Sequence, residues 1–537
     1  MAISKLLVAN RGEIALRVFR TCEQLGIETV AVVAPDDSAS LHARSAGRTV
    51  EVASYLDAAE HVRAAHESGA DAVHPGYGFL AENADFAAAV EAAGLTWVGP
   101  PPAALRLGGD KLAAKRTAAE ADVPTLPTGD AADVGFPLLV KAAAGGGGRG
   151  MRVVRSPDEL EEALAAARRE AEAAFGDGTV FCERFLERPR HVEVQLLADA
   201  HGTVVALGER DCSVQRRHQK VVEEAPAPRL SSALRSRLAA AAVAFGQAIG
   251  YRSAGTAEFL VEGDELYFLE LNGRIQVEHP VTEAVTGLDL VEQQLGIAAG
   301  ERLVTDRHKG VGHAVEARLY AEDPRSFLPQ VGRLERLRLP GDVRVDAGVE
   351  EGDEVTASYD PLLAKLVAHG RTREEALDRL GQALVETEVA GLVTNLRFLR
   401  WLVAHPAFRA GGVSTAFLVE HPPLSAPPLR LPAGPWRGAW RLNLPAPPPA
   451  PPPDVDAAAR THSGHAGGGE VTAPMPGTVI EVRVAPGQEV AARDPLVLLE
   501  AMKLEHPVAS PFDATVAAVH VAPGDQVAAG ALLVELF

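Results

Sequence analysis

The sequence predicts a multidomain α/β protein that ends in a small all-β domain. Three observations predict this fold class. Strands and helices alternate over residues 1–110, as in a parallel sheet covered by helices. Strand signals crowd residues 192–270, as in an antiparallel sheet. Two similar strand-and-turn units, within residues 471–487 and 516–524, follow a proline-rich stretch.

Pattern changes along the chain divide it into units. The alternation of strand and helix stops near residue 110, and a helix then leads to strands on either side of a glycine-rich loop. Another mixture of strands and helices begins near residue 311 and runs to the proline-rich stretch. We therefore expect domains at 1–110, 111–310 and 311–425, a linker at 426–469, and a last domain at 470–537.

Composition excludes several classes of function. The chain has 537 residues, more than a single core usually holds, and a net charge of −20. That charge argues against nucleic acid as a partner, and no apolar run is long enough to predict a membrane span. Three widely spaced cysteines, Cys22, Cys182 and Cys212, indicate a reducing compartment. With no signal-peptide pattern at the N-terminus, we expect a cytoplasmic protein.

The linker is rich in proline and then in glycine, a composition that cannot bury enough apolar surface to fold. Its first part is expected to be stiff and extended, and its last part flexible. Trp436 and Trp440 lie inside it. They either pack on the main body or provide a docking point for another subunit.

A glycine-rich loop, Gly145–Gly148, follows the strand that ends near Lys141. Glycines let the backbone approach phosphates closely, with its amides directed at them. A flexible surface loop is the alternative interpretation. The loop is not a P-loop, because no Gly-Lys-Ser/Thr follows it, and its spacing is not that of the Rossmann fingerprint.

An oxygen-rich cluster is predicted on one face of a sheet. Glu270 and Asn272 are two residues apart on a strand, so they share a face, and Glu258 has a comparable position on the preceding strand. Two carboxylates and an amide oxygen suit Mg²⁺, or Mn²⁺, together with substrate phosphates. The alternative is a pair of solvated carboxylates.

Near the C-terminus, Glu500-Ala-Met-Lys503 lies between the two strand-and-turn units. A lysine at a hairpin tip is held out for modification. The sequence resembles the attachment site of biotinyl carrier domains, in which Ala-Met-Lys marks the lysine that carries biotin. Lipoyl domains share the flattened barrel but usually have Asp-Lys-Ala there.

Residues 1–420 resemble biotin carboxylase, an ATP-grasp enzyme. This resemblance implies an N-terminal carboxylase domain, an ATP-grasp domain with a mobile lid, and a C-terminal carboxylase domain. It rests on the runs Asn10–Ile14, His74–Leu80, Gly109–Lys111, Glu183–Leu186, Pro189–Glu193, Glu209–Ser213, Gln215–Pro226, Arg274–Pro280 and Tyr359–Pro361.

The resemblance also implies roles for residues. Lys220 would reach the transferred phosphoryl group or bicarbonate, and Glu258, Glu270 and Asn272 would hold the metal ion. The residues implied to bind ATP are Lys111, Lys141, Gly146, Gly147, Glu183, Leu186, His191, Gln215, His218 and Gln219.

For the carboxylation step, the resemblance implies a bicarbonate pocket of Arg274, Gln276 and the backbone of Val277. Glu278 would be the base that deprotonates bicarbonate for attack on ATP, and Arg344 would stabilise the biotin enolate. Arginine suits both tasks, because it stays charged and presents several donors in one plane. The implied catalytic set is Glu278, Arg274, Arg344 and Lys220.

The chain departs from the family pattern in three places. Gly273 stands where Thr is usual, which puts in doubt how firmly the adjacent ligands are held. Leu504 replaces the usual second Met after the biotin lysine, a change that conserves volume. Residues 43–56 are shorter than usual.

No part of the sequence corresponds to a domain that could take the carboxyl group to an acyl-CoA. The chain therefore resembles the short α subunit of acetyl- or propionyl-CoA carboxylases of fatty acid biosynthesis. We expect a separate carboxyltransferase β subunit, a biotin protein ligase, self-association and a larger α–β complex. Three alternatives remain: the α component of an oxoacid carboxylase, another ATP-grasp ligase with lipoate at Lys503, and a non-catalytic carrier or regulator.

Overall fold

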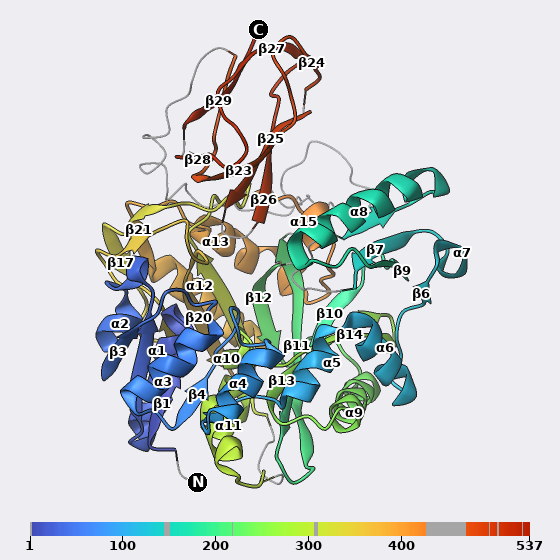
Figure 1. Ribbon diagram of the computed structural model, residues 1–537. Coiled ribbons are helices and arrows are strands. Elements are labelled where there is room, and N and C mark those ends of the chain that lie inside the picture. The colour runs from blue at the N-terminus through green and yellow to red at the C-terminus, as the bar shows by residue number, and fades with distance from the viewer. Residues whose placement is uncertain are drawn as a thin grey trace, which may run out of the picture.

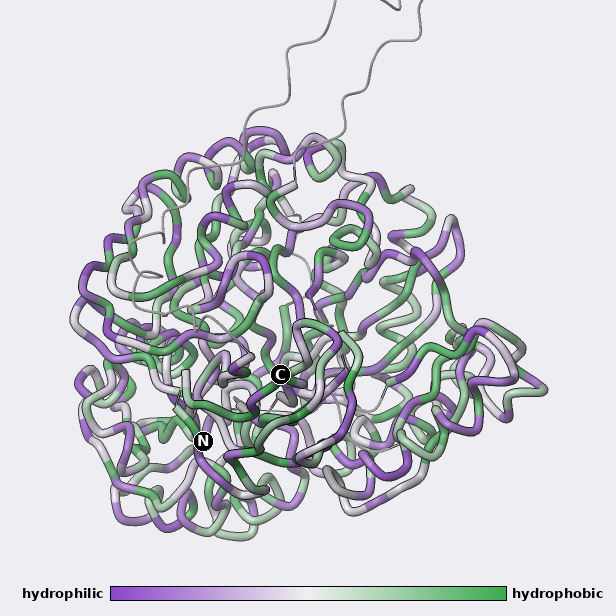
Figure 2. Tube along the Cα trace, turned by 90° about the horizontal axis from the view of Figure 1, so that it is seen from above, coloured by the Kyte–Doolittle hydropathy of each residue, from purple (hydrophilic) through white to green (hydrophobic). Residues whose placement is uncertain are grey.

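The computed structural model describes residues 3–143, 151–216, 219–304, 310–425, 469–492, 494–501, 504–528 and 530–537 (Figure 1). Gly146, Gly147, His218 and Lys503, together with Trp436 and Trp440, lie outside the described residues. In the described part, no helix is long and apolar enough to cross a membrane. Viewed from above, hydrophilic and hydrophobic residues are interspersed along the chain (Figure 2).

The N-terminal unit is a five-stranded parallel sheet in the order β3-β2-β1-β4-β5, which confirms the predicted parallel fold. Helices connect the strands, and the first ends at Gly26, whose φ of 70° favours glycine. The strands are β1 (Lys5–Val8), β2 (Glu28–Val33), β3 (Arg48–Glu51), β4 (Ala72–His74) and β5 (Thr96–Trp97). The helices are α1 (Gly12–Leu25), α2 (Leu41–Ser45), α3 (Ala58–Ser68), α4 (Ala84–Ala92) and α5 (Pro102–Gly109).

A small antiparallel unit follows α6 (Lys111–Glu120), with the strand order β6-β9-β7-β8. Helix α8 (Leu160–Phe175) packs on this sheet through an apolar stripe that includes Leu160, Leu164 and Ala167. The elements are β6 (Thr128–Gly129), α7 (Ala131–Val134), β7 (Leu138–Ala142), β8 (Arg152–Val154) and β9 (Val180–Arg184).

The centre of the molecule is an eight-stranded sheet in the order β14-β13-β10-β11-β12-β15-β20-β18. It joins the units expected at 111–310 and 311–425, because β12 pairs directly with β15. The strands are β10 (Arg190–Ala198), β11 (Val204–Arg216), β12 (Gln219–Ala225), β13 (Ser253–Glu262), β14 (Glu265–Asn272), β15 (His313–Tyr320), β18 (Arg344–Ala347) and β20 (Leu362–Gly370).

Helices and short strands surround this sheet. One core, which includes Ala317, Leu366, Leu380 and Phe398, lies between strands β15 and β20 and helices α12 and α13. The helices are α9 (Ser232–Ala248), α10 (His279–Thr286), α11 (Leu290–Ala299), α12 (Arg373–Glu386), α13 (Leu396–Ala404), α14 (Pro406–Arg409) and α15 (Phe417–Glu420). The short strands are β16 (Gly332–Arg333), β17 (Arg336–Arg338), β19 (Glu354–Val355) and β21 (Glu388–Ala390).

The C-terminal domain, red in Figure 1, consists of two four-stranded antiparallel sheets, ordered β22-β29-β27-β24 and β26-β25-β23-β28. This confirms the predicted all-β unit. β25 and β26 form a hairpin in which Ala501 pairs with Leu504. The strands are β22 (Glu470–Thr472), β23 (Gly477–Val482), β24 (Glu489–Val490), β25 (Pro495–Ala501), β26 (Leu504–Ala509), β27 (Ala514–Val519), β28 (Gln526–Val527) and β29 (Leu532–Leu536).

Candidate active site

Lys220 on β12 is the centre of the predicted site. Its ammonium donates to Glu193 at 2.5 Å, to Glu258 at 2.8 Å and to Glu278 at 2.6 Å. Burial opposes the charge on this amine, but the three carboxylates outweigh burial and raise its pKa well above the usual value. Lys220 therefore stays charged and holds three acidic side chains from different elements around one point.

The predicted metal ligands meet on strands β13 and β14. Glu258 pairs in register with Glu270, and the Asn272 amide donates to Glu258 at 2.8 Å. Burial and the nearby Glu258 raise the pKa of Glu270. Two like-charged carboxylates, one buried and one half-buried, favour a cation between them, so these three residues fit Mg²⁺ or Mn²⁺.

Glu278, immediately before α10, is fully buried. It accepts from Lys220 and, at 2.9 Å, from the guanidinium of Arg318. Burial acts to raise its pKa, but Lys220, Arg318 and Arg210 lower it well below the usual range. Sequence reasoning missed Arg318. The signal was present, since Glu316 and Arg318 are two residues apart on a strand that is mostly apolar.

Arg344 does not join this cluster. It lies on β18, at the end of the central sheet, where its guanidinium donates to Glu283 at 2.7 Å and to Asp346 at 2.8 Å. Arg344, which the resemblance implied would stabilise the biotin enolate, thus lies apart from Glu278. β20 separates its strand from β15, and Arg318 on β15 is the arginine that contacts Glu278.

The predicted bicarbonate residues form a hydrogen-bonded turn. Arg274 donates to Asn272 at 3.0 Å and to Gln276 at 3.2 Å, and the carbonyl of Val277 accepts from the fully buried Lys365 at 3.0 Å. Glu82 accepts from Arg274 at 3.0 Å. Lys365 and Glu82 were absent from the sequence-based set, because both come from distant parts of the chain.

Gly273 is held despite its missing side chain. Its backbone N–H donates to Glu82 at 3.0 Å. A Cβ at this position would lie 2.8 Å from Cδ2 of Leu105, a buried residue of α5. Leu105 therefore occupies part of the space that a larger side chain at position 273 would need.

The described ATP-site residues fall into two groups. In the first, Glu183 on β9 pairs with Lys141 and with Lys115, a lysine that sequence reasoning missed. Burial lowers the pKa of Lys111, whose amine lies 3.5 Å from the carbonyl of Ala142. Leu186, just after β9, is half-buried.

The second group lies beside Lys220. The imidazole of His191 pairs with Glu258 at 2.8 Å, and its Nδ1 is 2.8 Å from the amide of Gln215. Burial opposes the charged imidazole, but Glu258 outweighs burial and raises the pKa of His191. The side-chain oxygen of Gln219 accepts from Arg216 at 2.5 Å.

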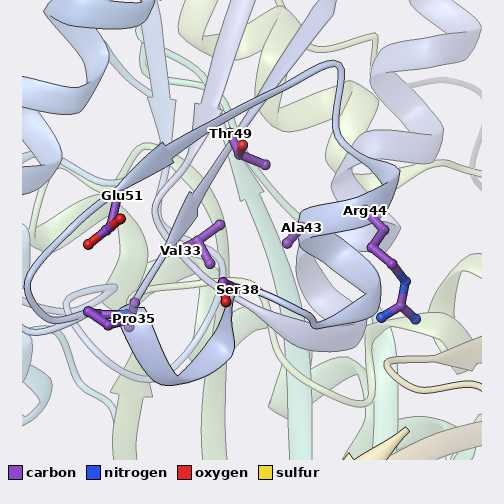
Figure 3. A pocket seen from close by; sticks show the side chains of 8 residues that line it. Val33, Pro35, Ser38, Ala43, Arg44, Thr49 and Glu51 are labelled. Atoms are coloured by element: carbon purple, nitrogen blue, oxygen red, sulfur yellow. The ribbon is translucent and has the colours of Figure 1, made fainter. Parts of the chain in front are cut away.

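A separate cavity of about 350 Å³ lies beside the carboxyl ends of β2 and β3 (Figure 3). Its lining includes Ser38, Arg44 and Glu51, and none of the predicted site residues. The cluster around Lys220 is thus distinct from this cavity.

Four family models match the chain in succession. They are described as biotin carboxylase, N-terminal domain, over residues 2–105; carbamoyl-phosphate synthase L chain, ATP binding domain, over 110–306; biotin carboxylase C-terminal domain, over 316–420; and biotin-requiring enzyme, over 469–536.

Curated relatives agree with these matches. A biotin carboxylase of Halalkalibacterium halodurans is 48% identical over 440 residues, which cover 78% of this chain and 97% of that protein. A methylcrotonoyl-CoA carboxylase subunit alpha of Glycine max is 49% identical over 441 residues. The match covers 78% of this chain but spans only 60% of that relative's length.

Solved structures share the fold. A biotin carboxylase complex from Campylobacter jejuni has a TM-score of 0.76 at 39% identity, covering 78% of this chain and 99% of that chain. The biotin carboxylase domain of Hydrogenobacter thermophilus 2-oxoglutarate carboxylase, solved with MgADP, ADP and bicarbonate, has a TM-score of 0.77 at 43% identity. That match covers 79% of this chain and 98% of the other. The chain therefore belongs to the biotin carboxylase family and carries its ATP-binding domain and a biotin-requiring domain on one polypeptide.

Proposed function

We propose that this chain carboxylates biotin attached to Lys503, at the expense of ATP and with bicarbonate as the carboxyl source. The observation that carries the proposal is the position of Lys220. Its ammonium bridges Glu258, a ligand for the metal that ATP brings, and Glu278, an ionised buried base. One cation thus links the phosphate side of the site to the bicarbonate side.

Glu278 has the properties of a general base. Its carboxylate is fully buried and remains ionised, because Lys220 and Arg318 lower its pKa. When these cations turn toward bound anions, their hold on Glu278 weakens and its affinity for a proton rises. Glu278 then accepts the proton of bicarbonate, which leaves an oxygen free to attack the γ-phosphoryl group of ATP.

The other residues bind and orient the substrates. Arg274, Gln276 and the backbone of Val277 hold bicarbonate, and Arg318 in place of Arg344 supplies the positive charge beside the base on the biotin side. Mg²⁺ or Mn²⁺ held by Glu258, Glu270 and Asn272 would neutralise charge on the phosphates. The relative solved with MgADP and bicarbonate supports this assignment. The residues that the resemblance implied for ATP, among them Lys111, His191 and Gln219, are assigned to ATP binding.

For the whole assembly, we propose the α subunit of an acyl-CoA carboxylase of the acetyl- or propionyl-CoA type. A separate carboxyltransferase β subunit would complete it, and a biotin protein ligase would modify Lys503. A propionyl-CoA carboxylase alpha chain of Ruegeria pomeroyi, 45% identical over 473 residues, supports this reading. The likeness to the 2-oxoglutarate carboxylase domain favours a second candidate, the α component of an oxoacid carboxylase.

The test is transfer of labelled bicarbonate to the purified, biotinylated full chain. We expect ATP-dependent label on the unaltered chain and none on Lys503→Arg, which should still hydrolyse ATP with free biotin. Glu278→Gln should lower both reactions by about 10²–10⁴-fold, the usual contribution of a general base. Full activity of Glu278→Gln would contradict the role given to Glu278.

The acceptor is tested separately. Co-purification of the biotinylated chain with a carboxyltransferase, followed by assay with acyl-CoAs and 2-oxoacids, distinguishes the two candidates. Carboxylation of an acyl-CoA by the isolated chain would contradict the need for a β subunit.

A further inference from the structure

Two buried glutamates adjoin the cluster around Lys220 and have no role in the reaction described above. Glu223 on β12 and Glu316 on β15 are opposite each other in the strand register, and both are 0% exposed. Side chains opposite each other on adjacent strands are close neighbours. Arg318, two residues after Glu316 on the same face of β15, forms an ion pair with Glu223 and also contacts Glu278.

Apolar packing closes this face of the sheet. Val281 of α10 packs against Ala225 on β12, Ala314 on β15 and Val367 on β20. The first two of these strands carry the glutamates, and Val367 lies opposite Glu316 on the third. Water is therefore kept from the two carboxyl groups, and their charges depend on protein groups alone. The titratable groups on the elements packed around the pair are Cys212, Lys220, Glu278, His279, Glu283 and Lys365.

If both Glu223 and Glu316 were ionised, their negative charge would exceed the positive charge that the neighbouring cations can offer them. Arg318 is shared between Glu223 and Glu278, Lys220 is shared among three other carboxylates, and Lys365 pairs with Glu13 at 3.0 Å. Within the described part of the chain, neither carboxyl oxygen of Glu316 has a hydrogen-bond partner. A proton on Glu316 would remove one charge and provide the missing hydrogen bond.

Burial also favours the protonated form of these carboxyl groups. It raises the pKa of Glu223 to about 7, against the pull of Arg318, and raises the pKa of Glu316 well above its usual value. Two adjacent buried carboxyls cannot both ionise at low cost, and they titrate as a pair. The geometry and the missing partner therefore agree on one proton between them.

We propose that Glu223 and Glu316 form one positioning unit for the base Glu278. Glu316 is a carboxylic acid that donates its proton to the carboxylate of Glu223, and Glu223 holds the Arg318 guanidinium against Glu278. This inference rests on the proposed role of Glu278 as the base. Loss of the shared proton at alkaline pH puts two carboxylates in competition for Arg318 and draws it away from Glu278.

The experiment compares pH profiles of bicarbonate-dependent ATP hydrolysis for the full chain and two variants. Glu316→Gln keeps a neutral hydrogen-bond donor at every pH, so the alkaline limb of its kcat profile should move upward by at least one pH unit. Glu223→Gln should lower kcat about tenfold with little change in KM for ATP, because Arg318 loses its anchor.

Glu224→Gln is the matched control. Glu224 is equally buried on the same strand, but it points to the opposite face and pairs with Arg373 at 2.6 Å and with His313 at 2.8 Å. It should lower thermal stability without moving the alkaline limb. Superimposable profiles for the unaltered chain and Glu316→Gln would overturn the proposal, and an inactive unaltered chain would instead overturn the proposed function.

Infrared spectroscopy gives a readout that does not depend on activity. At neutral pH the unaltered chain should show the carbonyl band of a buried protonated carboxyl group. Glu316→Gln should lose the contribution of the shared proton to this band, and Glu224→Gln should keep the full intensity. A band of undiminished intensity in Glu316→Gln, or its absence from the unaltered chain, contradicts the shared proton.

Discussion

The carboxylase body and the biotinyl domain bury different kinds of side chain. In the body, Glu193, Arg210 and Glu278 are all fully buried, and each has charged or hydrogen-bonding partners. Among the described residues of the biotinyl domain, the buried polar residues are His506 and Ser510, and its core is otherwise apolar. The difference shows what each region does. Proton and phosphoryl transfer need charges held away from water, whereas the biotin-requiring domain is built around an apolar core.

The largest effect should come from removing a buried cation from the body. Arg210 donates to Glu193 and Gln195 at 2.6 Å, to Thr282 at 2.9 Å and to Thr256 at 3.1 Å. Arg210→Met leaves Glu193 buried beside one fewer positive charge and should lower the free energy of unfolding by about 3–5 kcal/mol. Denaturant unfolding measures this loss of stability. A loss below about 1 kcal/mol would mean that buried charges matter no more to the body than exposed ones do.

The next effect is a pH dependence of the body. Burial lowers the pKa of His74 from 6.5 to about 4, and its Nδ1 accepts from the N–H of Gly76 at 3.0 Å, so the folded state needs the neutral imidazole. The unfolded state binds more protons between pH 6.5 and 4. Stability should therefore fall as pH drops through this window, by on the order of 3 kcal/mol at its acid end.

Urea midpoints at several pH values measure this dependence. His74→Gln should flatten it, because glutamine does not titrate. His66→Gln is the control, since His66 lies exposed at the end of α3 and its replacement should leave the slope unchanged. If stability falls equally with pH in all three chains, then groups other than His74 cause the loss of stability at acid pH.

A smaller effect is expected where the body departs from its family. Gly273→Thr places a Cβ 2.8 Å from Leu105 and should cost about 1–3 kcal/mol of stability, with a raised KM for bicarbonate because Arg274 is the next residue. Adding Leu105→Ala should restore KM. Unchanged kinetics in Gly273→Thr would show that the Leu105 side chain can move aside without disturbing Arg274.

The smallest effect should lie on the biotinyl domain. Arg483 pairs with Glu481 at 2.8 Å, and their side chains are 40% and 52% exposed. Arg483→Ala should change the unfolding free energy by about 0–1 kcal/mol, because solvent already screens the pair. A loss as large as that of Arg210→Met would mean that the carrier also depends on fixed charges.

Local patterns predicted the elements better than the contacts between them. Alternation along one strand placed Glu270 and Asn272 on the same face, and strand–helix alternation predicted the parallel sheet. Arg318 was missed because its contact with Glu278 depends on how the strands are arranged. A charged residue in a strand does not reveal which strand lies beside it, and Arg318 meets Glu278 across 40 residues of sequence. Lys115, Glu82 and Lys365 depend equally on long-range packing.

The pairing of β12 with β15 has a consequence for how the chain can be divided. Family boundaries suggest a cut near residue 310, but a fragment that stops there would keep Glu278 and lose Arg318. It would also leave the edge of β12 unpaired, with Val222 no longer opposite Ala317. Such edges recruit other chains. The carboxylase body should therefore be produced whole, since a cut near residue 310 separates Glu278 from Arg318 and β12 from β15.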